Sequence, residues 1–360
     1  MKPEIDALFV HYHSGPWLAD AVRALREDWA ASGLAGRIVV VDNGSTPGER
    51  AGFSALDVTL LEAGSNLGFA AAVNLGVAAT TAPHLLLVNP DVQVAQGCCR
   101  ALLQALAHGA AVAGPRFFWD DAHHFQLPPT EPLEAGYRML RMAGERNQGC
   151  LRLARQRWRQ HARRIWRTTQ PVDCFSLSGA LLAIRRAAWS AVGPFDESFF
   201  MYYEETDWLQ RVRRHGLSAR FVPEAQAVHY CARSTPEAEA AGRHMRASEQ
   251  LFFDRRFGKI GHRLLQRGAA WLPATAGPAL PVWDPQTQAL ARPGEGEVWV
   301  EVSPRAEGFP AAGHLWRPEQ GTTWRMPDAT WRTLTAGPYV LMMADQAGRE
   351  FHPHAFTKSA

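Results

Sequence analysis

The feature that most constrains the fold is a series of apolar runs that alternate with helix-like segments in the first 120 residues. RIVVVDNGS (37–45) and HLLLVNPDVQV (84–94) are each largely apolar before they reach turn residues, so they predict strands buried on both faces. WLADAVRALREDWA (17–30) has apolar residues at helical spacing. Strands that alternate with helices predict an α/β fold built on a doubly wound, mostly parallel sheet. Further strands are predicted at 7–13, 110–118, 176–189 and 218–230, and further helices at 97–108 and 236–257.

Acidic residues follow two of these predicted strands. Asp42 lies just past the apolar part of one, and Asp91 just past the apolar part of the other. In doubly wound sheets, ligands bind beyond the carboxyl ends of the strands. Each acid could instead cap a turn or a helix, but two acids on the same rim favour a ligand site.

A second group of acids lies in FFMYYEETDW (199–208), where aromatic residues flank Glu204, Glu205 and Asp207. Like charges this close repel one another, and a carboxylate near apolar rings loses hydration. Such an arrangement is easiest to keep if a positive charge neutralises it or if one acid takes part in chemistry.

Composition excludes several classes of protein. The 360-residue chain has 46% hydrophobic and 20% charged residues and a net charge of +3, as in a globular protein that is no obvious nucleic-acid binder. The five cysteines form no CxxC pair, which predicts free thiols in a reducing compartment. No signal peptide precedes the first strand, and no apolar run approaches the roughly 20 residues that span a bilayer. We therefore expect a cytoplasmic protein, with peripheral attachment to the inner face of the membrane left open.

The segment 131–170 is strongly basic, with ten arginines against three acids, a net charge of +7. Trp158, Ile165 and Trp166 interleave with the arginines, so part of the segment predicts a basic amphipathic helix. Such a helix suits an anionic membrane face or a phosphate-bearing acceptor. The alternative is a solvated helical face that packs on the sheet, while RNA binding has no supporting motif.

The last part of the chain, 271–360, has many tryptophans and repeated Gly and Pro turns. EVWVEVS and PYVLMMA predict strands, so we expect a small all-β appendage of unknown role. Its tryptophans are either core side chains or exposed rings that stack on sugars.

Five motifs in order carry a family resemblance: VVVDNGS, NLGFAAAVNLG, LLLVNPDV, SGALLAIRRAAWSAVGPFDESFFMYYEETDW and VHYCARST. Over roughly residues 5–255 they resemble a family-2 glycosyltransferase with the GT-A fold, and more narrowly its rhamnosyltransferase-like branch. The resemblance implies a catalytic domain over 1–265 with a nucleotide-binding half and an acceptor half. Residues 131–170 are then an insertion, and 271–360 lie outside the resemblance.

The implied activity is inverting, hexosyltransferase-type transfer of a sugar from a dTDP or UDP donor. By family branch, L-rhamnose from dTDP-rhamnose is the first choice, and the acceptor is a hydroxyl of a growing bacterial surface glycan or glycolipid. A catalytically inactive protein that binds nucleotide sugars or glycans is the alternative. A glycoside hydrolase is disfavoured, because it needs two carboxylates separated across the sugar.

Site residues follow from the resemblance position by position. The nucleotide-binding set is Val10, Tyr12, Asp42, Asn66, Gly68, Phe69 and Asn89, with Asp42 accepting a hydrogen bond from the base. The metal-binding set, for Mg²⁺ or Mn²⁺, is Asp91 and His229, although Asn89 fills the first position of the family's usual Asp-x-Asp pair. The catalytic set is Glu205 as general base, Glu204 as the alternative base, and Asp207. The acceptor-binding set is Asp196 and Trp208.

Overall fold

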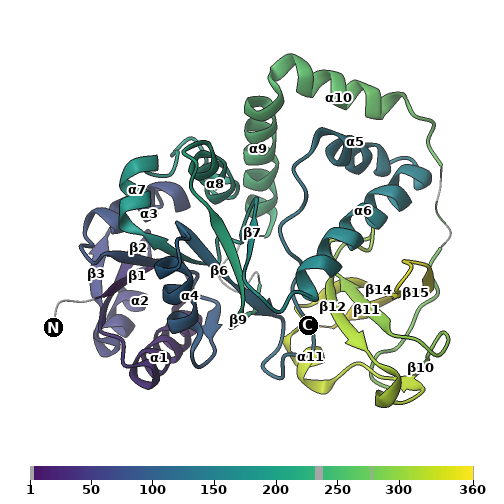
Figure 1. The fold of residues 1–360 in the computed structure, drawn as a ribbon, viewed down its shortest axis with the longest axis horizontal. Coiled ribbons are helices and arrows are strands. Elements are labelled where there is room, and N and C mark those ends of the chain that lie inside the picture. Colours follow the sequence, from purple (N-terminus) through teal and green to yellow (C-terminus); the bar gives the residue numbers. More distant parts are fainter. Residues whose placement is uncertain (1–3, 232–237, 276, 278, 360) are drawn as a thin grey trace. The chain divides into compact units, whose positions relative to one another are not determined.

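The computed structural model describes residues 4–231, 238–275, 277 and 279–359 (Figure 1). The chain forms two compact units, one of Met1–Phe117 with Thr168–Arg256 and one of Phe118–Arg167 with Phe257–Ala360. This grouping differs from the predicted division near residue 265, since the predicted insertion is grouped with the C-terminal strands. Within the described residues, none of the helices is both long and apolar enough to cross a membrane.

The first unit contains a nine-stranded sheet in the order β3-β2-β1-β4-β8-β6-β9-β5, with β7 paired to β9. Strands β1 to β4 pair in parallel, whereas β8 pairs antiparallel with both β4 and β6, and β9 pairs antiparallel with β5 and β7. The mixed α/β fold class is therefore confirmed, and its parallel part is the N-terminal half. The strands are β1 (Ile5–His11), β2 (Gly36–Asp42), β3 (Thr59–Glu62), β4 (His84–Val88), β5 (Val92–Val94), β6 (Val112–Phe118), β7 (Val172–Cys174), β8 (Leu181–Arg185) and β9 (Ala219–His229).

Helices cover both faces of the parallel part (Figure 1). Alternate side chains of β1, such as Phe9, enter one core cluster with the apolar side chains of α1 and α4. The intervening Leu8 lies against α3, where a Cβ added at Gly76 would stand 2.2 Å from Leu8 Cδ1. This burial on both faces explains why the central positions of these strands are apolar in succession rather than in alternation. The helices of this unit are α1 (Gly15–Ser32), α2 (Pro47–Ala51), η1 (Gly52–Leu56), α3 (Phe69–Ala78), α4 (Cys98–Ala107), α7 (Arg186–Val192), α8 (Glu204–Arg214) and α9 (Ala238–Phe257).

Two predicted strands are shorter than expected. Residues 84–94 form β4 and β5, separated by the Asn-Pro-Asp turn, and residues 176–189 form β8 followed by the start of α7. All five cysteines are free, in agreement with the prediction from their spacing.

The second unit is built on a four-stranded antiparallel sheet in the order β12-β11-β14-β15. The predicted C-terminal β region is thus present, and its tryptophans 283, 299, 316 and 324 are buried, so they are core side chains. The strands are β10 (Leu290–Ala291), β11 (Val298–Ser303), β12 (Ala312–Trp316), β13 (Thr323–Trp324), β14 (Gly337–Asp345) and β15 (Glu350–Lys358). The helices are α5 (Ala135–Gly144), α6 (Gln148–Trp166), α10 (Lys259–Trp271), η2 (Pro318–Gln320) and α11 (Asp328–Thr333).

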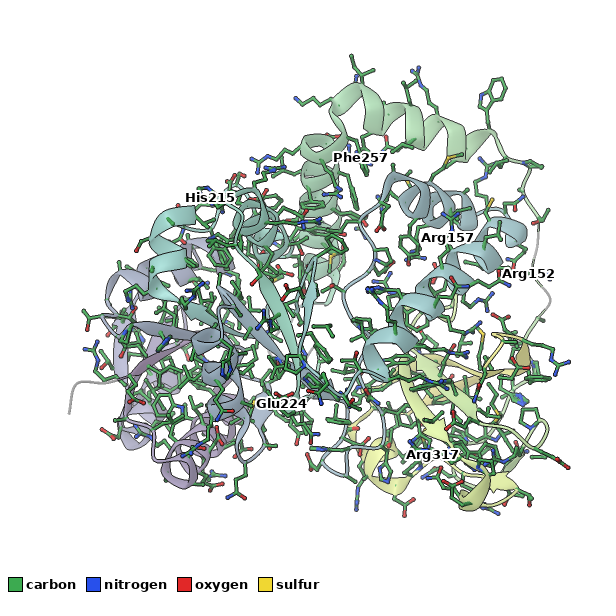
Figure 2. All side chains as sticks on the ribbon, in the orientation of Figure 1. Arg152, Arg157, His215, Glu224, Phe257 and Arg317 are labelled. Carbon is green, nitrogen blue, oxygen red and sulfur yellow. The ribbon has the colours of Figure 1, made fainter. Side chains whose placement is uncertain are left out.

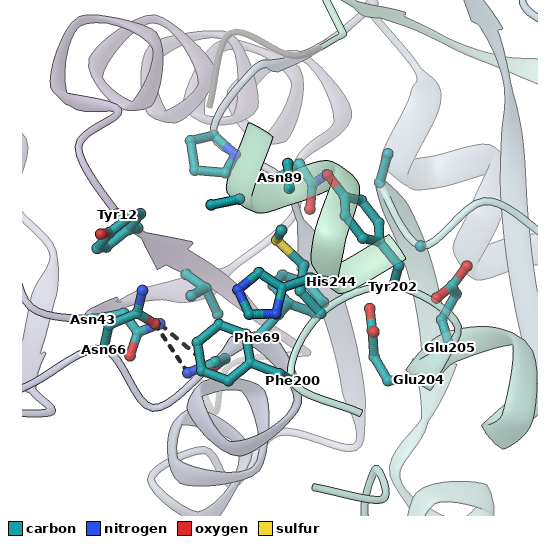
Figure 3. Close-up of a pocket in the computed structure, with 18 of the residues that line it drawn as sticks. Tyr12, Asn43, Asn66, Phe69, Asn89, Phe200, Tyr202, Glu204, Glu205 and His244 are labelled. Atoms are coloured by element: carbon teal, nitrogen blue, oxygen red, sulfur yellow. Dashed lines mark hydrogen bonds between the residues drawn. The ribbon is translucent and has the colours of Figure 1, made fainter. Parts of the chain in front are cut away.

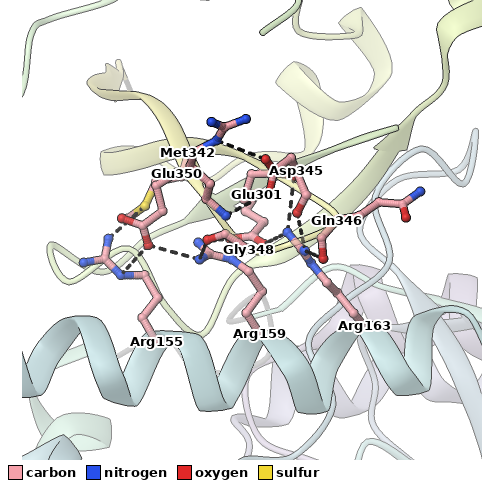
Figure 4. Close-up of polar contacts among 11 residues, drawn as sticks. Arg155, Arg159, Arg163, Glu301, Met342, Asp345, Gln346, Gly348 and Glu350 are labelled. Atoms are coloured by element: carbon pink, nitrogen blue, oxygen red, sulfur yellow. Dashed lines mark hydrogen bonds and ion pairs between the residues drawn. The ribbon is translucent and has the colours of Figure 1, made fainter. Parts of the chain in front are cut away.

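Helix α6 turns three of its arginines toward this sheet (Figure 4). Arg159 pairs with Glu301 through two hydrogen bonds, Nε to Oε1 at 2.7 Å and Nη2 to Oε2 at 2.8 Å, and both side chains are at most 1% exposed. Its Nη1 also donates to Glu350 at 3.0 Å. Arg155 pairs with Glu350 at 3.2 Å, and Arg163 donates to the Asp345 carbonyl at 2.6 Å.

These arginines recur every fourth residue, so they form one row along the helix. Of the two alternatives for the basic segment, this row follows the one that packs on a sheet, because its arginines are buried and pair with Glu301 and Glu350. Burial lowers the pKa of Arg163 to about 10, against the opposing effect of Glu301. Arg152 and Arg157, labelled in Figure 2, remain exposed on the same helix.

Replacing Arg159 should destabilise the second unit. We expect Arg159→Leu to lower the free energy of unfolding by about 3–5 kcal/mol, because Glu301 stays buried without its bidentate partner. Replacing both residues with leucine should recover most of that loss. Calorimetric unfolding of the full chain would measure both effects, with exposed Arg152→Leu as a control that changes stability by about 0.5 kcal/mol or less. Equal effects of Arg159→Leu and Arg152→Leu would contradict a stabilising role.

Candidate active site

A pocket of about 310 Å³ lies in the first unit, near the carboxyl ends of the parallel strands (Figure 3). That volume falls in the range of small-molecule sites. It is lined by Val10, Tyr12, Asn43, Asn66, Gly68, Phe69, Asn89, Pro90, Ser178, Gly179, Ala180, Phe200, Met201, Tyr202, Glu204, Glu205, His229, Ala240, Ala241 and His244. Six of the seven predicted nucleotide-binding residues, both predicted base candidates and His229 therefore share one pocket.

One end of the pocket is a hydrogen-bonded loop between β3 and α3. The Asn43 amide donates to Asn66 Oδ1 at 3.0 Å, and the same oxygen accepts the Gly68 backbone N–H at 3.0 Å. Gly68 has φ of 85° and lies so close to Phe200 that an added Cβ would stand 2.6 Å from its carbonyl oxygen. Only glycine fits that position, since both the conformation and the contact exclude a side chain.

Asp42 was predicted to bind the nucleotide base, but it does not line the pocket. Its carboxylate accepts the Ser45 N–H at 2.9 Å, lies 3.3 Å from Arg50 Nε, and is buried. The pocket wall at this point is Asn43 instead. Asp42 was predicted as a hydrogen-bond acceptor for the base and Asn43 was not, although Asp42 ends β2 and Asn43 directly follows it.

The predicted metal ligands are brought together across two paired strands. Val92 of β5 lies opposite His229 of β9, and His229 Nε2 stands 3.4 Å from Asp91 Oδ1. Burial by itself lowers the pKa of the His229 imidazole, but Cys231 and the Asp91 carboxylate outweigh it and raise that pKa well above its ordinary value.

One carboxylate and one imidazole suit a divalent cation that completes its shell with phosphate oxygens and water. No group of three or more His, Cys, Asp or Glu side chains arranged for a metal occurs in the part of the chain that the structure describes. Asp91 and His229 therefore fit a cation that takes two ligands from the protein and the remaining ligands from elsewhere. The motif VHYCARST continues to residue 235, and its residues 232–235 lie outside the described ones.

At the other end of the pocket, Glu204 and Glu205 open helix α8 (Figure 3). The preceding Tyr202 and Tyr203 both have positive φ, 72° and 68°, a strained conformation for tyrosine that is typical of functional sites. Burial and the neighbouring Glu205 raise the pKa of Glu204 well above its ordinary value, and burial also raises that of Glu205. The partial positive charge of the helix N-terminus offsets part of the cost of ionising the pair.

The absence of a side chain at Gly179 leaves room for the Glu205 side chain. A Cβ added at Gly179 would stand 2.9 Å from Glu205 Cγ and 3.3 Å from its carboxyl carbon. Thr206 Oγ1 donates to Glu205 Oε1 at 3.2 Å, which orients the carboxylate further. The SGA segment (178–180) that precedes β8 thus fits against the acid.

Four other predicted site residues do not line the pocket: Asp91, which is buried behind it, and three residues of the segment 196–208. Asp207 pairs with Arg211 at 3.0 Å on α8. Asp196 accepts hydrogen bonds from Ser198 at 2.6 Å and Arg255 at 2.7 Å, so it organises its own loop. Trp208 is 0% exposed and donates to the Gly193 carbonyl at 2.8 Å. Its prediction as an acceptor-binding residue is corrected, because a fully buried ring in the core cannot touch an acceptor.

Several pocket residues were not predicted. Phe200 stacks on His244 with ring centroids 4.4 Å apart, and Tyr202 stands beside them (Figure 3). Phe200 and Tyr202 belong to the aromatic residues that flank the acid cluster, so a signal for them existed in the sequence. His244 lies 44 positions after Phe200 on α9, and only the tertiary fold brings it here.

Comparison with known proteins is consistent with this geometry. The model of the family described as "Glycosyl transferase family 2" matches residues 7–174. N-acetylglucosaminyl-diphospho-decaprenol L-rhamnosyltransferase of Mycobacterium tuberculosis is 30% identical over 266 residues, which span 68% of this chain and 82% of the relative. The chain therefore belongs to glycosyltransferase family 2, and within it to the rhamnosyltransferase-like branch. It is a hexosyltransferase-type enzyme of glycan biosynthesis.

Two more distant proteins are also similar. Low-salt glycan biosynthesis hexosyltransferase Agl10 of Haloferax volcanii is 25% identical over 203 residues, which span 55% of this chain and 60% of the relative. Among solved structures, the mannosyltransferase PcManGT from Pyrobaculum calidifontis in complex with GDP-Man and Mn²⁺ superposes with a TM-score of 0.46 at 15% identity. The match covers 75% of this chain and 70% of that one.

Gly179→Ala should impair transfer while leaving the fold intact. The new methyl group would push the Glu205 side chain aside, and a displacement of about 1 Å at a reacting group costs on the order of 100-fold in rate. Nucleotide release measures the loss, and the thermal midpoint checks the fold. Gly15→Ala is the matched control, because nothing lies within 4 Å of the added Cβ. Equal activity of the two variants would show that Glu205 does not need this close fit.

Proposed function

We propose that this glycosyltransferase moves L-rhamnose from dTDP-rhamnose to a hydroxyl group of a lipid-linked bacterial surface glycan, with inversion at the anomeric carbon. The single observation that carries the proposal is the pocket with Tyr12 and Asn66 toward one end and Glu204 and Glu205 at the other (Figure 3). Donor and acceptor class are supported by the name of the mycobacterial relative, a rhamnosyltransferase that acts on a decaprenol-linked sugar. We assign the reaction to the first unit, to which every pocket residue belongs.

In the proposed reaction, the acceptor hydroxyl attacks the anomeric carbon from the face opposite the diphosphate. A new C–O bond forms as the bond from the sugar to the diphosphate breaks, and the hydroxyl proton passes to a Glu205 carboxylate oxygen. The loop that holds Asn66 and Gly68 binds the nucleotide and directs the diphosphate toward Asp91. A divalent cation bound by Asp91 and His229 would offset the charge that grows on the leaving diphosphate.

Glu205 is the better base of the two adjacent acids. Two neighbouring carboxyl groups with little access to water titrate as a pair. Burial raises the pKa of Glu204 well above its ordinary value and also raises the pKa of Glu205, but Thr206 donates a hydrogen bond to Glu205 that acts in the opposite direction. In the proposed reaction Glu205 is therefore the base, and Glu204 is the neighbour that supports it.

A panel of nucleotide sugars tests donor and metal together. We expect dTDP-rhamnose to give the fastest nucleotide release with a lipid-linked acceptor, and EDTA to abolish release until Mg²⁺ or Mn²⁺ is restored, since the leaving diphosphate needs a positive charge. Faster release from another donor would overturn the assignment of rhamnose. Full activity in EDTA would overturn the metal role of Asp91 and His229. Donor turnover with no acceptor product in any combination would contradict transfer itself.

The general base is tested by Glu205→Gln. We expect kcat to fall by about 100-fold or more, the size typical of a removed general base, with donor binding by calorimetry unchanged. In the unaltered protein, kcat should rise with pH through the raised pKa of the pair, because the base acts only when ionised. Glu204→Gln should keep more activity than Glu205→Gln. Exposed Glu239→Gln on α9 is the control that leaves kcat unchanged, and a larger loss for Glu204→Gln would reverse the two roles.

A further inference from the structure

Helix α10 carries an exposed apolar row that the proposed reaction does not use. Its inner face packs on α5, where His262 and Ala269 are buried. On the outer face, Ile260 is 76% exposed, Leu264 is 61% exposed and Trp271 is 92% exposed. Separations of four and seven residues place these three side chains along one line of the helix. Large apolar side chains gathered on one exposed helix face mark an interaction site more often than single ones do.

A row of cations runs beside this apolar row. Lys259, Arg263 and Arg267 are exposed and follow one another at four-residue intervals, so they too lie along one side of the helix. Helix α10 contains no acidic residue, and none of these three cations forms an ion pair with the residues that the structure describes. Their charge is therefore available to a partner outside the unit.

We propose that the outer face of α10 docks on an anionic lipid bilayer, with Ile260, Leu264 and Trp271 in the headgroup–acyl boundary and the three cations against lipid phosphates. An exposed apolar row bordered by Lys and Arg is the pattern of a helix that lies in the membrane interface. A cationic row without a single acid matches a uniformly negative surface better than it matches a protein face of mixed charge. The row on α6 contrasts with it, because Arg155, Arg159 and Arg163 are buried and pair with Glu301 and Glu350 within the unit.

Vesicle sedimentation with the full chain tests this surface. We expect binding to vesicles of phosphatidylcholine mixed with phosphatidylglycerol at low salt, weaker binding to phosphatidylcholine alone, and loss of binding as salt rises. Ile260→Ser/Leu264→Ser should weaken binding by about tenfold or more, since two apolar side chains no longer leave water. Arg263→Gln/Arg267→Gln should weaken it by roughly 30-fold, about fivefold for each cation.

The control variants carry the same types of substitution at exposed positions of the second unit outside α10. Leu153→Ser/Val282→Ser removes two apolar side chains that are 51% and 86% exposed outside α10, and Arg152→Gln/Arg157→Gln removes two exposed cations of α6. Both should bind vesicles as the unaltered chain does. Subtracting the emission spectrum of Trp271→Phe from that of the unaltered chain isolates the emission of Trp271. With anionic vesicles this emission should shift to shorter wavelength, because an inserted Trp271 loses contact with water.

Three outcomes would overturn the inference: no binding of the unaltered chain to anionic vesicles at low salt, unchanged binding of Ile260→Ser/Leu264→Ser, or an equal loss in the controls. Self-association that the α10 variants abolish in sedimentation velocity, without any vesicle binding, would assign the surface to a second copy of the chain instead. The vesicles hold neither donor nor acceptor, so the result stands or falls separately from the proposed reaction.

Discussion

The placement of two adjacent glutamates at the start of α8, Glu204 buried and Glu205 partly buried, is the constraint on which the site depends. Two carboxyl groups in contact cannot both be ionised at low cost away from water, so the pair retains a proton and the pKa of each group is raised. The surroundings are adapted to this pair: two tyrosines before it take a left-handed backbone conformation, and Gly179 leaves room for the Glu205 side chain. A buried carboxylate with a raised pKa is suited to accept a proton near neutral pH.

The opposite end of the pocket depends on backbone geometry rather than on charge. Glycine at position 68 permits a positive φ and a close approach to Phe200, which joins the loop between β3 and α3 to the loop between α7 and α8. Phe69 N–H donates to the same Phe200 carbonyl at 2.6 Å. Main-chain contacts thereby connect the two loops that line the pocket.

Positive charge is divided between two uses in the second unit. On α6, the row of Arg155, Arg159 and Arg163 neutralises Glu301 and Glu350 of the sheet, and it fastens a helix far away in sequence to the C-terminal strands. On α10, the cations pair with no acid in the part of the chain that the structure describes, and they stay exposed beside apolar side chains. A net charge counted over a segment therefore says little about its partner until the direction of each side chain is known.

The sequence by itself determined the α/β class, the parallel N-terminal strands, the C-terminal β region, the family and nine of the twenty residues that line the pocket. These features depend on local periodicity, on strand-end turns and on short motifs, which are all readable over a few positions. Only the tertiary structure decided that Asn43 rather than Asp42 lines the pocket, that Trp208 is a core side chain, that His244 joins Phe200, and that the arginine row of α6 turns inward. Each of these depends on which side chains meet across long separations in the chain, and burial against a distant partner leaves no local pattern in the sequence.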